Sequence, residues 1–315
     1  MRKRCRWCGR PGSGEDSNGP DVLGFNDSKN RFVNRLRDLL GSRLRAFEAV
    51  VPGGYSFGVT SANSNKPQPP VDSSRVTGVF AKQPEVGKVK TRFEPFLAPI
   101  LGNSGPAELA AALLQDAAER YVGQELGLEL VYAPAEAASW FAGAFPDHKL
   151  RAQRGDGLGE RMASWFVEIL GDLPKGGTAV AIGADSPWTS VARVRTAHEL
   201  LRSGADVVLG PDFGGGYYLV GLREPQAGLF TEIEMSTGEM FDATCGWIEA
   251  RGLRLALLDK DYDLDAEADW RSLERDLQIP RSVECDRDWP KHLAAFADRV
   301  KSCQNQTQTG GPREP

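Results

Sequence analysis

Two groups of carboxylates follow apolar runs that have the length of buried strands. Asp185 closes the run GTAVAIGAD at 177–185, and the last apolar run leads into the acidic segment DKDYDLDAEAD at 259–269. A carboxylate at the end of a buried strand can ligate a hard divalent cation that carries phosphate oxygens. We therefore expect a Mg²⁺ or Mn²⁺ site beside Asp185.

Each group also has a purely structural explanation. Asp185 could cap the helix expected to begin near Thr189, but Ser186 or Thr189 could supply that cap, so the pattern favours the metal ligand. The acidic segment fits a solvated turn that caps the next helix as well as it fits the rest of a metal site. We expect only one of Asp263 and Asp265 to face the metal. The segment carries Asp259, Asp261, Asp263, Asp265 and Asp269.

Four basic residues lie in the segment FAKQPEVGKVKTR at 80–92, which directly follows the first apolar run. Because they fall within eleven positions of one loop, they can converge on one anion such as a diphosphate. The alternative is an ordinary solvated basic loop, but the position after a buried strand favours phosphate binding. The glycine spacings of the P-loop and of the dinucleotide fingerprint are absent. The four residues are Lys82, Lys88, Lys90 and Arg92.

A run of three glycines lies within the segment GPDFGGGYYLVGL at 210–222. Backbone without side chains permits a tight turn or the close approach of a ligand. Taken alone, the run is a weak signal for either.

The elements that must position these residues alternate between strand-like and helix-like patterns. This alternation predicts an α/β fold with a mostly parallel sheet and helices on both of its faces. Ligands of such sheets gather at the carboxyl ends of the strands, where both charged groups are expected. The predicted strands are 75–82, 128–134, 177–185, 205–211, 217–222 and 253–259, and the predicted helices are 106–122, 158–170, 191–203 and 237–251.

The chain of 315 residues is expected to have three parts. Residues 1–75 have the composition of a linker, with one basic amphipathic helix at about 27–48 that could contact a membrane or a partner but more simply packs on its own domain. Residues 76–280 form the α/β domain. Residues 281–315 are a C-terminal extension, and the polar tail after Val300 is expected to be disordered.

Composition narrows the class of partner. A formal net charge of −5 favours neither nucleic acid nor anionic lipid, so we expect small-molecule partners. No apolar run reaches roughly 18 residues, which predicts a cytoplasmic protein without stable membrane insertion. Five cysteines suit reduced thiols, and the pair Cys5 and Cys8 lacks a second pair of zinc ligands nearby. The oligomeric state is not indicated.

Six segments, in this order and spacing, resemble the bacterial glycosyltransferase-like family labelled arsenosugar biosynthesis type. The resemblance covers about 77–277, and that family is similar to GT-A glycosyltransferases, 2-phospholactate guanylyltransferases and molybdenum-cofactor nucleotidyltransferases. It implies a Rossmann-like nucleotide-diphospho-sugar transferase fold. The segments are FAKQPEVGKVKTR (80–92), QRGDGLGERM (153–162), IGADSP (182–187), GPDFGGGYYLVGL (210–222), MSTGEMFDAT (235–244) and DYDLDAEAD (261–269).

The resemblance implies a role for each matching position. Asp185 would hold the metal with Asp263 or Asp265 beside it, and Asp185 and Asp265 are the catalytic candidates. Two positions depart from the family's pattern. Gly214 stands where the family has an aspartate, with Asp212 as the only nearby acid, and Met235 stands where the family has a tryptophan. The candidates for nucleotide and phosphate binding are Lys82, Lys88, Lys90, Arg92, Gln153, Arg161, Gly215 and Gly216.

Three functions fit these residues. The first is a glycosyltransferase that uses a nucleotide-diphosphate sugar, a divalent metal and a small acceptor. The second is a nucleotidyltransferase that joins an NTP to a phosphorylated acceptor in the same cradle. The third is a nucleotide-binding protein without turnover, which Gly214 favours because an acid is missing there.

Overall fold

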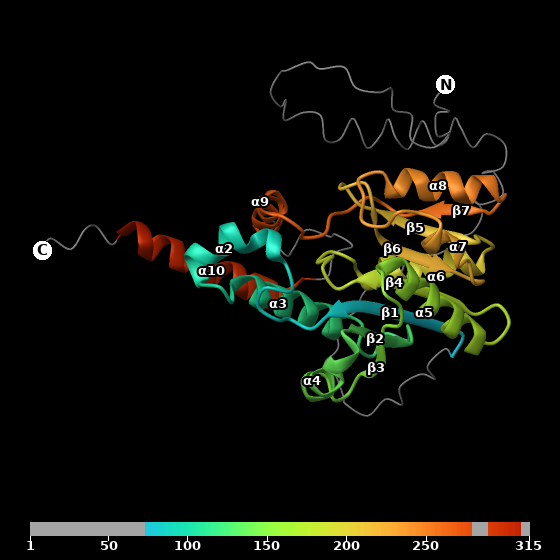
Figure 1. The fold of residues 1–315 in the computed structure, drawn as a ribbon, viewed down its shortest axis with the longest axis horizontal. Helices are drawn as coiled ribbons and strands as arrows, with labels where there is room; N and C mark the ends of the chain where they lie inside the picture. The colour runs from blue at the N-terminus through green and yellow to red at the C-terminus, as the bar shows by residue number, and fades with distance from the viewer. Residues whose placement is uncertain (1–72, 279–288, 310–315) are drawn as a thin grey trace, which may run out of the picture. The chain divides into compact units, whose positions relative to one another are not determined.

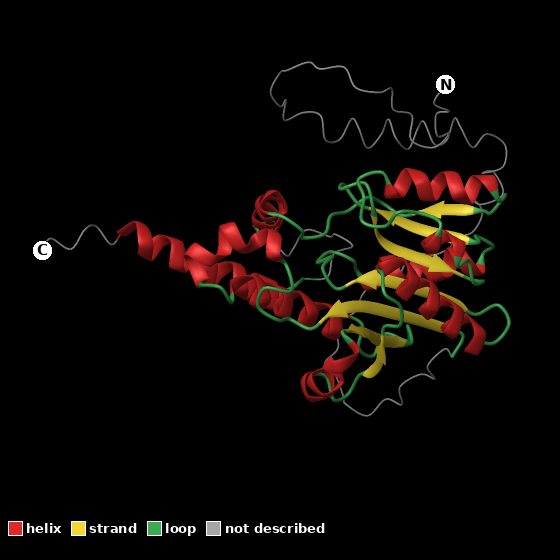
Figure 2. Cartoon of the chain, viewed as in Figure 1, coloured by secondary structure: helices red, strands yellow, loops and turns green. Residues whose placement is uncertain are grey.

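The computed structural model describes residues 73–278 and 289–309, which form one seven-stranded mixed sheet with helices on both faces (Figures 1 and 2). The strand order is β3-β2-β1-β4-β6-β5-β7. Within this sheet β6 runs antiparallel to both of its neighbours, and the other pairs are parallel. The strands are β1 (Arg75–Lys82), β2 (Leu128–Ala133), β3 (Lys149–Ala152), β4 (Thr178–Gly183), β5 (Val207–Pro211), β6 (Tyr217–Leu222) and β7 (Leu255–Leu257).

Alternating apolar side chains of the strands fill two cores, one on each face of the sheet. The first core packs against α3 (Gly105–Arg120), α4 (Ala138–Ala144) and α6 (Val191–Arg202). The second packs against α5 (Leu158–Asp172), α7 (Gly228–Thr231) and α8 (Met240–Ala250). The expected layering is therefore confirmed.

A third core joins four helices at the carboxyl end of β1, where α2, α3 and α10 lie together in Figure 1. It contains Leu97 of α2 (Glu94–Leu101), Leu109 of α3, Trp270 of α9 (Glu267–Asp276) and Phe296 of α10 (Lys291–Thr309). Leu264, from the loop before α9, is fully buried in the same core. The C-terminal helix thus helps to fix a loop that carries candidate site residues.

The sheet topology brings three segments to one edge. Parallel β1 and β4 end at the same edge, and the chain leaves β5 for antiparallel β6 there as well. Because β4 lies between β1 and β6, the residues after β4 must lie between the loop after β1 and the β5–β6 turn. All three segments carry candidate residues.

Two expectations about the ends of the chain have different outcomes. The disordered tail does not begin after Val300, because α10 continues to Thr309 and its apolar side joins the third core. The amphipathic helix expected at about 27–48 and the cysteine pair lie outside the described residues.

No helix in the described ranges is long and apolar enough to cross a bilayer. The short strand β3 and the helices α2, α4, α7 and α10 were not predicted.

Asp116 of α3 fastens the start of α10, since its carboxylate accepts the backbone N–H groups of His292 at 3.0 Å and Leu293 at 2.8 Å. Asp116→Ala would leave both donors in a buried contact without this acceptor, so we expect a loss of about 1–2 kcal/mol in the free energy of unfolding. Urea denaturation measures the loss, and hydrogen exchange should increase first in α10. Unchanged exchange in α10 would contradict the assignment.

Candidate functional site

A cavity of about 940 Å³ opens at this edge of the sheet. The segments that line it come from far apart in the sequence. They include the loop after β1, the end of β4, the β5–β6 turn, the segment before α8 and the loop before α9, and residues of α3, α5 and β6 and the residue after β3 also line the cavity. The charged side chains that line it are Lys82, Lys88, Lys90, Arg92, Asp185, Asp212, Asp263, Asp265 and Asp269.

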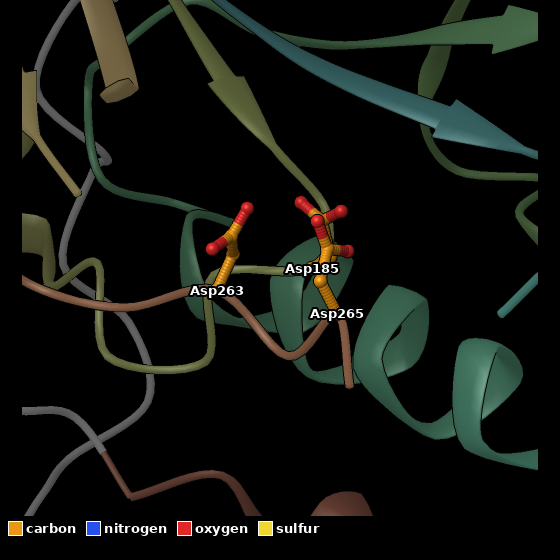
Figure 3. A group of neighbouring side chains, drawn as sticks. All are labelled: Asp185, Asp263 and Asp265. Carbon is orange, nitrogen blue, oxygen red and sulfur yellow. The ribbon is translucent and has the colours of Figure 1, made fainter. Parts of the chain in front are cut away.

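Three carboxylates gather in this cavity. One oxygen from each of Asp185, Asp263 and Asp265 lies within 4.8 Å of the other two, and all three residues are half-buried. Figure 3 shows Asp185 just beyond β4, with Asp263 and Asp265 on the neighbouring loop. Three converging carboxylate oxygens are the ligand type that Mg²⁺ and Mn²⁺ prefer, so the group could hold either ion.

The loop that carries two of these acids, residues 262–266, is called the acid loop here. The backbone N–H of Leu264 donates to the carbonyl of Asp185 at 3.1 Å, which ties the loop to the end of β4. Because Leu264 is buried on one side, Asp263 and Asp265 are left on the other side with Asp185. Tyr262 is held by Trp188, whose indole donates to the tyrosine hydroxyl at 2.6 Å.

One expectation about these acids was wrong, and the disfavoured alternative, a helix cap at Asp185, is not observed either. Both Asp263 and Asp265 join Asp185, because residues two apart in a segment of alternating side chains point to the same side. Asp185 does not cap the next helix, and neither Ser186 nor Thr189 does. Ser190 occupies that position, and its side chain accepts the backbone N–H of Arg193.

The acidic segment serves structure and site at once. Asp269 caps α9 by accepting the backbone N–H groups of Asp265 at 2.9 Å and Ala266 at 2.7 Å. Asp261 is buried in an ion pair with Arg193. The two explanations offered for this segment therefore apply to different residues, and only Asp263 and Asp265 face Asp185.

Lys90 lies between two of the three acids. Its ammonium is 3.1 Å from Asp185 Oδ2 and 3.0 Å from Asp265 Oδ1, and its side chain is only 11% exposed. Burial alone would lower the pKa of Lys90, but the charges of the two carboxylates raise it above its ordinary value. The same contacts lower the pKa of Asp185 against the effect of its own burial. The ammonium of Lys90 is thus paired with two carboxylates and is not a free cation in the cavity.

The other basic residues of the loop after β1 also line the cavity, so this loop, residues 82–92, is called the cationic loop. Lys82 is exposed at the end of β1. Lys88 is 68% exposed and pairs with Glu85 at 2.7 Å, and Arg92 is 75% exposed, 4.0 Å from Asp265. The exposed cations can reorient toward an anion, whereas Lys90 is constrained.

The glycine run forms the turn between β5 and β6 on the opposite side of the cavity. Gly215 has φ +91°, and a Cβ there would lie 2.0 Å from the carbonyl oxygen of Gly238. Gly215 therefore permits a backbone contact and does not itself line the cavity, whereas Gly216 does. The wall on this side is called the turn wall, and it consists of Asp212, Phe213, Gly214, Gly216, Tyr217, Met235, Ser236, Thr237, Gly238 and Met240.

Asp212 is a site residue that was not among the candidates predicted from sequence. It is 8% exposed, and its carboxylate accepts the backbone N–H of Gly216 at 2.8 Å. Burial raises the pKa of Asp212, although the N–H groups of the glycine turn oppose the shift. A Cβ on Gly214 would lie 3.2 Å from Asp212 Oδ1, so an acid is present beside the position where the family's aspartate is missing.

Of the candidates Gln153 and Arg161, only Gln153 lines the cavity. Gln153 lines the cavity, and its side-chain amide donates to the carbonyls of Val131 at 2.8 Å and Ala81 at 3.3 Å. Arg161 is not among the lining residues, because its guanidinium donates to the carbonyls of Gly155 at 2.8 Å and Asp156 at 3.2 Å. Arg161 thus shapes the turn before α5.

The pKa of Asp263 is raised by its surroundings in the cavity. Burial, together with the charges of Asp185, Asp265 and Asp212, raises the pKa of Asp263 to about 7. The folded protein therefore retains a proton that the unfolded chain releases near pH 4. As a result, the contribution of Asp263 to the stability of the metal-free protein should decline as the pH rises from about 4 to about 7 and should level off above that.

Asp263→Asn should flatten this decline, because the amide carries no titrating proton. Urea denaturation in a chelating buffer, repeated across that pH range for the wild type and the variant, measures the difference. Identical slopes for the two proteins would contradict the assignment of this titration to Asp263.

Part of the chain matches a family of bacterial proteins. Residues 113–237 match a family model described as "Uncharacterized protein conserved in bacteria (DUF2064)", a segment that includes Gln153, Asp185 and the glycine run. No curated protein matches the chain.

Several solved structures are similar to this chain. A protein from Desulfovibrio desulfuricans G20, provisionally described as a nucleotide-diphospho-sugar transferase, is 26% identical, with a TM-score of 0.64 over 74% of this chain and 97% of that chain. A 4-diphosphocytidyl-2C-methyl-D-erythritol synthase from Anaerococcus prevotii DSM 20548 is 13% identical, with a TM-score of 0.42 over 66% of this chain and 98% of that chain. The expected Rossmann-like fold class is confirmed.

Proposed function

We propose that this domain is a metal-dependent glycosyltransferase that takes a sugar from a nucleotide-diphosphate donor. The observation that carries the proposal is that the cationic loop and three converging carboxylates line one cavity at the carboxyl edge of the sheet. The likeness to the Desulfovibrio protein supports it, as does the resemblance of the six segments to the arsenosugar-biosynthesis-type family.

The donor set fits a divalent metal. Asp185, Asp263 and Asp265 would hold Mg²⁺ or Mn²⁺, whose charge would stabilise the diphosphate as it leaves. The raised pKa of Asp263, which burial causes first and the charges of Asp185, Asp265 and Asp212 increase, is in keeping with this assignment. The exposed cations of the cationic loop would bind the outer oxygens of the diphosphate. These cations are Lys82, Lys88 and Arg92.

Transfer requires one bond to form and one to break. The acceptor's hydroxyl oxygen bonds to the anomeric carbon of the sugar, while the bond from that carbon to the diphosphate oxygen breaks and the nucleoside diphosphate leaves with the electron pair. The hydroxyl proton passes to Asp212, a buried carboxylate on the turn wall whose raised pKa suits a general base.

Product analysis tests the proposal. The protein is incubated with Mg²⁺ and, in turn, with nucleotide sugars and with NTPs, each mixed with alcohols or with phosphorylated alcohols. Release of a nucleoside diphosphate from a nucleotide sugar is expected. Release of pyrophosphate from an NTP with a phosphorylated acceptor would instead identify a nucleotidyltransferase, and the absence of both products despite nucleotide binding would identify a protein without turnover.

A further inference from the structure

Positive charge is confined to one side of the cavity. Every basic side chain among the lining residues that the structure describes belongs to the cationic loop. The turn wall, on the other side, has Asp212 as its single charged lining residue within the described ranges. A second anionic group would therefore meet Asp212 on the turn wall, where Lys260, which does not line the cavity, already interacts with the Phe213 ring and with the charge of Asp212. This disfavours the binding of an anion there.

The turn wall instead presents an apolar surface. Phe213 is 62% exposed although it lines the cavity, and its backbone N–H is fixed by the carbonyl of Asp261 at 3.1 Å. Lys260, which does not line the cavity, lies with its ammonium 5.7 Å from the centre of the Phe213 ring. Leu158, at the start of α5, is 44% exposed in the same cavity. Large apolar side chains exposed beside polar groups in a cavity are typical of a ligand-binding surface.

The end of the cavity away from the turn wall carries Gln153. Gln153 follows β3, on the far side of β1 from β4, and both hydrogen bonds donated by its amide go to backbone carbonyls, which fixes its orientation. A diphosphate held between the cationic loop and Asp185 has a nucleoside at one end and a sugar at the other. With the nucleoside toward Gln153, the sugar lies toward β6 and the turn wall.

We infer that the acceptor is an uncharged hydroxyl compound with an aromatic or aliphatic face, which packs against Phe213. This inference rests on the proposed glycosyltransferase function and adds the chemical class of its second substrate. Phe213 is then a residue that determines acceptor specificity, and phosphorylated acceptors are rejected because Asp212 is the charged residue that lines the turn wall within the described ranges.

A binding screen with matched pairs tests the inference. Protein saturated with a nucleoside diphosphate and Mg²⁺ is screened by ligand-observed NMR against aromatic and alkyl alcohols and their phosphate esters, for example phenyl β-glucoside and its 6-phosphate. We expect the alcohols to bind and their phosphate esters to bind about tenfold more weakly or not at all, as the charge of Asp212 requires. Tighter binding of the esters, or a screen in which no alcohol binds, would overturn the inference.

Phe213→Ala isolates the role of the ring. We expect alcohol binding to weaken about tenfold, as for a buried aromatic contact, with unchanged affinity for the nucleoside diphosphate. Val122→Ala is the matched control, because Val122 is 55% exposed and lies outside the cavity. Weaker nucleotide binding in Phe213→Ala would show that the ring contacts the nucleoside and would overturn the inference. Failure of every nucleotide to bind the wild type would instead refute the proposed function.

Discussion

Replacing Asp185 with asparagine is expected to abolish metal-dependent nucleotide binding while leaving the fold intact. Asparagine preserves the size of the side chain but removes the charge that Asp185 shares with Asp263 and Asp265. Removing a residue that only hydrogen-bonds to a metal ligand lowers metal affinity about 10–100-fold. Removing the charge of a ligand itself should lower the affinity at least as much. Titration with Mn²⁺ followed by electron paramagnetic resonance measures the affinity directly.

The control is Asp298→Asn, which removes an equal charge from an exposed position on α10. This variant should bind Mn²⁺ as the wild type does. Wild-type Mn²⁺ affinity in Asp185→Asn, with unchanged circular dichroism, would show that the three carboxylates are not the metal site.

Replacing Lys90 with methionine should have two opposite effects. The metal-free protein should lose about 1–2 kcal/mol of stability, less than for a fully buried pair because Asp185 and Asp265 are 38% and 48% exposed. Its affinity for Mn²⁺ should rise, because the ammonium that repels a second cation from the same oxygens is gone. Thermal unfolding with and without Mn²⁺ should therefore show a larger metal-induced increase in Tm than in the wild type.

Lys88→Met is the matched control. Lys88 belongs to the same loop, but its ammonium pairs with Glu85 and not with any of the three carboxylates. It should leave both metal-free stability and Mn²⁺ affinity nearly unchanged. A lower Mn²⁺ affinity in Lys90→Met would mean that Lys90 organises the carboxylates rather than competing with the metal.

The central elements of the fold could be predicted from local patterns, because buried strands and amphipathic helices have distinct periods. β1 and β6 have the predicted bounds, 75–82 and 217–222. The strand β3 escaped prediction because it has only four residues, KLRA, of which none is fully buried. Residues 301–309 are mostly polar, yet they are helical because they continue a helix whose earlier turns pack on α2 and α3.

The site was predictable in its residue types but not in its pairings. Asp185 and the cationic loop could be placed because each follows a strand. The pairing of Lys90 with Asp185 and Asp265 joins residues 95 and 175 positions apart, so no local pattern encodes it. Asp212 was noted from the sequence only as the acid near Gly214, and its place in the site could not be predicted because it depends on the backbone of the glycine turn, which folds over its carboxylate.

The most direct test of the account is calorimetric titration of the wild-type protein with UDP, GDP, CDP and ADP, each in Mg²⁺ and in a chelating buffer. The cationic loop and the three carboxylates act on the same diphosphate, so at least one nucleotide should bind saturably in Mg²⁺ and at least tenfold more weakly without it. Binding that is equally tight in the chelating buffer, or no binding of any nucleotide, would contradict a metal-dependent nucleotide site in this cavity.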